Sequence, residues 1–249
     1  MLPYFFRHYD AVVDRYIIFD DGSTDATLEM LRQHPKVEVR PLPRLDVDSY
    51  VLAAQELHNS TWKESRGQAD WVILTAIDEH LYHPDLMAYL QTCRQDGVTL
   101  IPGVGYQMLS DTLPITDGKL CQLVTKGAPY ANMNKLSLFD PLQISETNFA
   151  VGRHTAKPAG HVVYPPEDAL LILHYKYLSE DWTFERHLEL EEKLGKHDKA
   201  NRWGAHYSWS KEEFKKSWIA FESNAIDPVL PMSNPANRPT PPNPPLWWR

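Results

Sequence analysis

The sequence predicts an α/β fold with a mostly parallel sheet and helices on both of its faces. Two apolar runs, residues 15–20 and 70–77, have the length and composition of buried strands, and each leads into a group of carboxylates. Segments with apolar residues at helical spacing separate these runs and continue the alternation through about residue 110. This alternation is typical of a parallel sheet covered on both sides.

The elements are expected in the following order. Apolar spacing predicts helices over 4–13, 25–33, 51–62, 85–96, 181–193 and 211–223. Short apolar or alternating segments predict strands over 15–20, 37–42, 70–77, 98–104, 107–109 and 170–173. Residues 119–165 contain short β-like pieces and many polar turns, which is typical of a smaller mixed subdomain. Numerous prolines after Asp227 predict an extended tail over 227–249, whose end, Leu246-Trp247-Trp248, is able to dock on the domain or on a partner.

Composition limits the classes of function. The chain has 249 residues and a net charge of -8, so it has no general attraction for nucleic acid or for an anionic membrane. Its two cysteines, Cys93 and Cys121, lack metal-like spacing and fit a reducing compartment. No apolar stretch reaches membrane-spanning length. We therefore expect a cytoplasmic protein, with peripheral contact at the inner face of a membrane as the alternative.

The first strand is expected to deliver an acidic turn to the carboxyl edge of the sheet. Asp20, Asp21, Ser23 and Asp25 follow the apolar run directly. Open α/β sheets bind ligands at that edge, and carboxylates there suit ribose hydroxyls, base N–H groups or a metal ion. The alternative is a polar connection whose carboxylate caps the next helix.

Two further strand ends carry groups suited to a metal and a diphosphate. Asp78 and Glu79 follow the run 70–77 and offer hard oxygen ligands to a divalent cation. His174 follows the apolar strand 170–173 and is a candidate imidazole ligand, while Lys176 suits a diphosphate oxygen. The alternatives are an acidic helix start for the carboxylates and a structural role for the histidine.

A fourth segment, Asn148 to His161, reads NFAVGRHTAKPAGH. Arg153, His154 and Lys157 are candidates for contact with an anionic group, and His154 for orienting an acceptor hydroxyl. A turn with surface charges is the alternative.

These segments together resemble GT-A fold nucleotide-sugar glycosyltransferases. The spelling DDGSTD at 20–25 resembles the nucleoside-binding turn of that superfamily, and IDEHLYH at 77–83 and HYKY at 174–177 resemble a bacterial subfamily related to family two. Ala76 departs from that pattern, because the family places an aspartate there. The resemblance also implies a strand before the first helix, so the sheet's first strand is expected to be missing and the start truncated.

The resemblance implies a Rossmann-like GT-A domain over 1–226, with a nucleotide-binding half over about 1–110 and an acceptor-side half over about 111–226. It implies transfer of a sugar from a nucleotide-sugar donor to a saccharide or glycoconjugate acceptor, with inversion and with Mn²⁺ or Mg²⁺. The candidate general bases are Glu146, Asp168 and Glu167, and His154 joins Glu146 and Asp168 as a candidate catalytic residue. Asp78, Glu79 and His174 are the expected metal ligands, and the expected donor-binding residues are Asp20, Asp21, Ser23, Asp25 and Lys176.

Other functions remain open or are excluded. A catalytically weakened nucleotide-sugar-binding or scaffold protein of the same fold is the main alternative, favoured by Ala76. A nucleotidyltransferase would need a glycine-rich basic loop near the N-terminus, which is absent. Asp20 lacks the D-x-D spacing of haloacid-dehalogenase-like phosphatases, and neither a G-x-S-x-G elbow nor a phosphate-binding P-loop is present.

Overall fold

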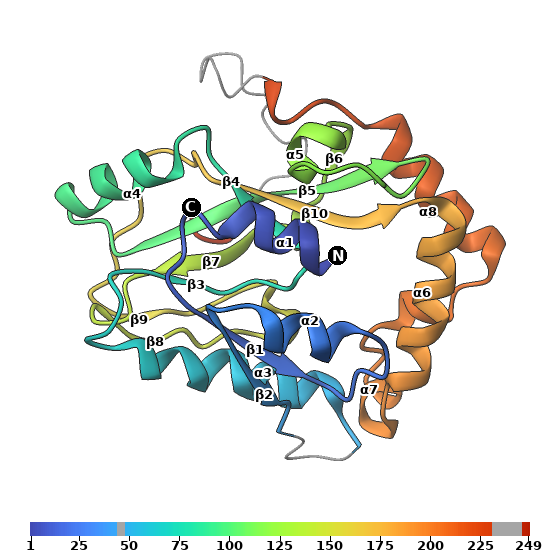
Figure 1. Ribbon diagram of the computed structural model, residues 1–249, viewed down its shortest axis with the longest axis horizontal. Helices are drawn as coiled ribbons and strands as arrows, with labels where there is room; N and C mark the ends of the chain where they lie inside the picture. Colours follow the sequence, from blue (N-terminus) through green and yellow to red (C-terminus); the bar gives the residue numbers. More distant parts are fainter. Residues whose placement is uncertain (44–47, 231–245) are drawn as a thin grey trace.

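The computed structural model describes residues 1–43, 48–230 and 246–249. Within these residues the protein is an α/β structure built around a six-stranded mixed sheet (Figure 1). The helices of the described residues are α1 (Leu2–Tyr9), α2 (Thr27–Gln33), α3 (Tyr50–Ser60), α4 (Leu86–Gln95), α5 (Leu120–Leu123), α6 (Glu180–Lys193), α7 (Lys196–Ala200) and α8 (Lys211–Ser223). Short 3₁₀ turns are η1 (Thr61–Ser65), η2 (Ala131–Met133), η3 (Val151–Arg153) and η4 (Ala205–Ser208).

The strands form three sheets. They are β1 (Tyr16–Asp20), β2 (Val37–Pro41), β3 (Val72–Ile73), β4 (Glu79–Tyr82), β5 (Leu100–Ser110), β6 (Gly127–Pro129), β7 (Lys135–Phe139), β8 (Ile144–Glu146), β9 (Ala159–Gly160) and β10 (Leu171–Leu178). The main sheet has the order β3-β7-β5-β10-β4, and β6 pairs with β5. β1 and β2 form a separate parallel pair, and β8 and β9 a separate antiparallel pair.

The expectation of a mostly parallel sheet is wrong for the main sheet. Among the described strands of that sheet only β5 and β10 run parallel, whereas the pairings of β4, β6, β7 and β3 are antiparallel. The runs 15–20 and 70–77 are mostly half-buried, so the expectation of buried strands is wrong there except at Tyr16, whereas the run 170–173 is fully buried within the main sheet. Burial on two faces produces the same continuous apolar run whichever way the neighbouring strand points.

Alternate residues of β10 pack into different cores. Ile172 belongs to a cluster with Phe5 and Leu90 from α1 and α4, whereas Leu171 and Leu173 belong to a second cluster with Leu120 of α5. This two-residue alternation is the expected geometry of a strand buried between two layers. Burying so many aliphatic and aromatic side chains, each worth about 1.5–3 kcal/mol, fixes β10 between β5 and β4 in the sheet.

The chain end closes over the second core. Trp248 is buried in the cluster of Leu171 and Leu173, and its indole Nε1 donates a hydrogen bond to Asp168 Oδ1 at 2.8 Å. Trp247 Nε1 donates to the carbonyl of Asn134 at 2.8 Å. The expected docking of the final aromatic residues is therefore seen. Most of the proline-rich tail, residues 231–245, lies outside the described residues.

Element boundaries differ from expectation mainly around the site. The expected strand over 70–77 contains only the two residues of β3, and the segment that follows Asp78 is itself a strand, β4. The strand expected over 170–173 continues to Leu178, so His174 and Lys176 lie within β10 rather than after it. The two strands expected over 98–104 and 107–109 are one continuous strand, β5.

Candidate functional site

Asp78 and His174 face each other in the main sheet. His174 Nε2 lies 3.5 Å from Asp78 Oδ2, and the side chains are 12% and 27% exposed, so the pair is reachable from solvent. The antiparallel pairing of β10 with β4 places His174 opposite Glu79, one residue after Asp78. The backbone N–H of Tyr175 donates to the Asp78 carbonyl at 2.7 Å and holds the turn against β10. Burial raises the pKa of Asp78, but His174 and Lys176 outweigh it and leave the pKa below its ordinary value.

A glutamine not identified from the sequence holds the other side of His174. Gln107 is completely buried in β5, directly opposite His174 in the parallel ladder. His174 Nδ1 lies 2.7 Å from Gln107 Oε1. The signal available in the sequence was a single polar residue inside the apolar run 100–109.

Lys176 lies two residues after His174 in β10, within the stretch where the pairing of β10 with β5 shifts register. Its ammonium donates to the hydroxyl of Tyr207 at 3.1 Å and lies 4.2 Å from the centre of that ring. Burial lowers the pKa of Lys176 to about 8, with Asp78 opposing this shift and Arg186 adding to it. A partly desolvated ammonium beside a carboxylate is a suitable partner for an anionic ligand.

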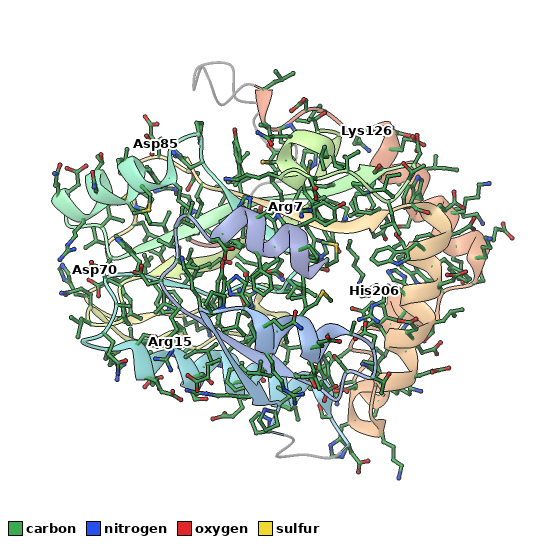
Figure 2. All side chains as sticks on the ribbon, viewed as in Figure 1. Arg7, Arg15, Asp70, Asp85, Lys126 and His206 are labelled. Atoms are coloured by element: carbon green, nitrogen blue, oxygen red, sulfur yellow. The ribbon has the colours of Figure 1, made fainter. Side chains whose placement is uncertain are left out.

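His206 adds another imidazole to the same region, and no motif in the sequence indicated it. It lies in η4, and Figure 2 places it in the view between α6 and α2. Burial lowers the pKa of His206 to about 4, and the nearby Lys176, His154 and His174 act in the same direction. The charges of Lys176, His154 and His174 thus all act on the imidazole of His206.

The acidic turn after β1 is tightly hydrogen-bonded. Asp20 accepts from the backbone N–H groups of Gly22 at 2.9 Å and Ser23 at 3.1 Å. Burial raises the pKa of Asp20, but the hydrogen bonds from Ser23 and Gly22 exceed that effect and lower it overall. Asp25 is exposed and accepts from the N–H of Thr27 at 3.0 Å, so it stabilises the start of α2. Asp21 is half-buried beside Asp20.

Electrostatic effects connect this turn to Asp78. The amino group of Met1 has its pKa lowered by burial, and both Asp25 and Asp78 raise it in opposition. Arg186 of α6 lowers the pKa of Asp25 as well as that of Lys176. In Figure 1 the N-terminus lies near the centre of the view, between α1 and α6.

Glu79 is directed away from this region into a buried ion network. Lys135 Nζ lies 2.7 Å from its Oε1, and Arg153 Nη2 lies 2.5 Å from its Oε2. The backbone N–H of Ala76 also donates to Oε2 at 3.2 Å. Burial raises the pKa of Glu79, but Arg153 and Lys135 hold it well below the ordinary value. Since both carboxylate oxygens have cationic partners, we leave Glu79 out of the proposed metal site, and Arg153 out of the anion-binding groups.

His154 lies next to this network. Its Nδ1 is 2.6 Å from the carbonyl of Asn132, so Nδ1 carries the proton and Nε2 is left as an acceptor. Gly152, with φ 68°, allows the ring to lie against the backbone, because a Cβ there would be 2.6 Å from Nε2. Burial and the charge of Lys135 lower the pKa of His154.

The carboxylates expected as general bases have other partners. Glu146 in β8 forms an ion pair with Lys63 at 2.7 Å. Asp168 accepts from Trp248 and from the Arg249 guanidinium, each at 2.8 Å. The remaining candidate, Glu167, is exposed. No local pattern indicates the pairs made by Glu146 and Asp168, because each pair joins segments far apart in the chain.

The donor atoms of Asp78 and His174 fit a divalent cation in chemistry and spacing. A carboxylate oxygen and an imidazole nitrogen are both ligands for a divalent cation, and a separation of 3.5 Å would let one ion contact both atoms. Across the described ranges, no group of three or more His, Cys, Asp or Glu side chains is placed to hold a metal. The protein would therefore supply two ligands, leaving the remaining positions to water and ligand oxygens, as is common for Mg²⁺.

Comparison with protein-family models and with curated proteins found no match to this chain. None of the helices in the described part of the chain has the length and apolarity needed to cross a membrane.

Proposed function

We propose that this protein is a GT-A-type glycosyltransferase that moves a sugar from a nucleotide-sugar donor to a saccharide or glycoconjugate hydroxyl in the cytoplasm. The observation that carries the proposal is the Asp78–His174 pair, 3.5 Å apart, with Lys176 two residues after His174 in β10. A carboxylate, an imidazole and an ammonium in this arrangement suit a divalent cation and a diphosphate together. The resemblance of these segments to the glycosyltransferase motifs supports the same function.

Each side chain has a role in this proposal. Asp78 and His174 hold Mn²⁺ or Mg²⁺, and such a cation neutralises charge that develops on a leaving nucleoside diphosphate. Lys176 binds a diphosphate oxygen through its ammonium. The turn containing Asp20 and Asp21 contacts the ribose or base. Together these groups offer contacts for an anionic centre and for a polar nucleoside end.

His154 is the proposed general base. Its Nδ1–H is held by Asn132, its Nε2 is an acceptor, and its lowered pKa keeps it neutral at pH 7. Nε2 takes the proton from the acceptor hydroxyl as the hydroxyl oxygen bonds to the anomeric carbon. The bond from that carbon to the diphosphate breaks in the same step, and the diphosphate leaves with the bonding electrons.

A non-catalytic nucleotide-sugar-binding protein is the second candidate. Two observations favour it: Ala76 stands where the resembling motif has an aspartate, and Glu146 and Asp168 are engaged in ion pairs. Such a protein would bind the nucleotide with its cation but would not turn over a donor.

Calorimetry with UDP and GDP, in Mn²⁺ and in EDTA, tests the shared part of both candidates. Binding is expected to require Mn²⁺ and to weaken at least tenfold in Asp78→Asn, with a smaller loss in Asp25→Asn. The control is Asp70→Asn, whose exposed carboxylate pairs with Arg94 at the surface. Equal binding in EDTA would contradict the metal role. A donor-hydrolysis screen with wild type and His154→Gln then separates the enzyme from the binding protein.

A further inference from the structure

The amide of Gln107 has one orientation available to it. Its Nε2 donates to two backbone carbonyls, of His174 at 3.0 Å and of Met108 at 3.2 Å. A flipped amide would point its oxygen at both carbonyl oxygens, and three acceptors would then face one another in a buried position. The completely buried side chain has no water to relieve that repulsion. Oε1 is therefore the atom that faces His174.

This orientation determines the proton on His174. Oε1 is only an acceptor, so His174 Nδ1 at 2.7 Å must donate. In the neutral ring the proton is then on Nδ1 and the lone pair is on Nε2. That lone pair faces Asp78 Oδ2 at 3.5 Å, which brings two acceptors together with no hydrogen between them. Either a proton on Nε2 or a divalent cation between the two atoms removes this repulsion.

We propose that Gln107 is a positioning residue that selects the Nδ1–H tautomer of His174 and thereby presents Nε2 to a divalent cation shared with Asp78. The role of Gln107 in metal binding rests on the proposed metal-assisted transfer. The tautomer of His174 does not depend on that proposal. Partners that orient a ligating imidazole from behind typically change metal affinity about 10–100-fold when they are removed. Gln107 does not touch the cation or the donor in this arrangement.

Long-range ¹H–¹⁵N spectra of histidine-labelled full-length protein at pH 8 test the tautomer without metal or substrate. Spectra of His174→Gln identify the signal of His174 among the eleven histidines. The expected wild-type state is Nδ1–H. A wild-type Nε2–H tautomer, or an imidazolium at this pH, would overturn the proposal.

Two variants separate positioning from packing. Gln107→Glu, as a neutral carboxylic acid whose hydroxyl replaces the Nε2 donor toward the carbonyls of His174 and Met108, keeps an acceptor for Nδ1–H and is expected to retain the tautomer. Gln107→Met removes the acceptor at similar volume and is expected to lose the preference and to bind Mn²⁺ at least tenfold more weakly. Gln122→Met, at an exposed position of α5, is the control for Mn²⁺ affinity. An unchanged tautomer in Gln107→Met would refute the positioning role, and if that variant does not fold, the wild-type and Gln107→Glu spectra decide.

Failure of the proposed function gives a different result. If wild type has the Nδ1–H tautomer and binds Mn²⁺, but no nucleotide binds with the ion, the role of Gln107 stands and the donor assignment fails.

Discussion

Arg153 donates a hydrogen bond to Glu79 at 2.5 Å, and both side chains are almost completely buried. Lys135 pairs with the other oxygen of the same carboxylate. The buried carboxylate of Glu79 thus compensates the charges of Lys135 and Arg153, at the residue that follows Asp78. This network connects η3, β4 and β7, so it holds the elements on which the candidate site is built.

Glu79→Gln is expected to destabilise the fold strongly. Removing the carboxylate leaves two buried positive charges without a counterion, a situation that typically costs about 3–5 kcal/mol. Urea unfolding monitored by tryptophan fluorescence measures the change. The matched control is Glu146→Gln, which breaks the partly exposed pair with Lys63 and is expected to cost about 1 kcal/mol or less. Similar losses in the two variants would contradict a structural role for Glu79.

Gly152→Ala is expected to displace the imidazole of His154. The added Cβ would lie 2.6 Å from Nε2, and the φ of 68° disfavours any side chain. In the proposed enzyme this lowers kcat at least tenfold with little change in nucleotide affinity, because His154 acts on the acceptor. Gly67→Ala provides the control, since Gly67 has φ 73° with open space around its Cβ position, so only backbone strain of about 1 kcal/mol is added. Equal kinetics in the two variants would argue against His154 as the base.

The proximity of Asp78 and His174 could be predicted from the sequence, although the reasoning behind that prediction was incomplete. Asp78 and His174 were expected together because the carboxyl ends of parallel strands share an edge. In the structure Asp78 precedes β4, and the antiparallel pairing of β4 with β10 brings the start of one strand beside the end of the other. Strand direction depends on tertiary pairing and on connections, and the apolar pattern contains neither.

Other features had no local signal. His206 lies in an irregular turn without a motif, and its place beside Lys176 depends on the packing of η4 against α6. The partners of Glu79, Lys135 and Arg153, are distant in sequence and look like ordinary surface charges there. The helices through α4 and the strands β1 and β2 were predicted well, because their apolar periodicity is strong, whereas β3 is shorter than expected and β4 was not predicted.

Stability is expected to fall as the pH decreases from about 6.5 to about 4. Burial lowers the pKa of His8 to about 4, whereas a histidine in the unfolded chain titrates near 6.5. The unfolded state therefore binds more protons in this interval, and folding loses roughly 3 kcal/mol for His8 across it. His58 and His187, with pKa values of about 3, add to the same slope.

Urea unfolding at pH 7, 6, 5 and 4.5 measures this slope. His8→Gln keeps a side-chain donor for the Leu81 carbonyl, which Nε2 contacts at 2.7 Å, and removes the titrating group. The variant is expected to show a shallower dependence, whereas His161→Gln, at an exposed position, is expected to match wild type. A wild-type stability that stays constant between pH 6.5 and 4.5 would show that these histidines do not unfold as neutral groups.

Asp168→Asn is expected to affect stability more than catalysis. Its carboxylate binds the indole of Trp248 and the guanidinium of Arg249, which fasten the chain end to the core. Loss of the charged pair is expected to cost about 1–2 kcal/mol, and Trp248→Phe, which retains apolar packing, about 1 kcal/mol. Thermal unfolding and steady-state kinetics are measured together. A large fall in kcat with unchanged stability would instead restore Asp168 as a catalytic residue.

Ala76→Asp is expected to raise the affinity for Mn²⁺ in the presence of nucleotide about tenfold, which corresponds to about 1.4 kcal/mol. Ala76 is exposed in the turn between β3 and β4, two residues before Asp78, so a carboxylate fits there without disturbing the core. The residue is in a turn and not in a strand, so the effect depends on proximity to Asp78 rather than on a shared strand face. The backbone N–H of Ala76, which donates to Glu79, is retained in the variant.

Ala76→Asn, with the same shape and no charge, is the control in calorimetric titrations. Equal affinities of Ala76→Asp and Ala76→Asn would show that position 76 lies outside the cation's reach, and the alignment of this segment with the glycosyltransferase motif would then be wrong.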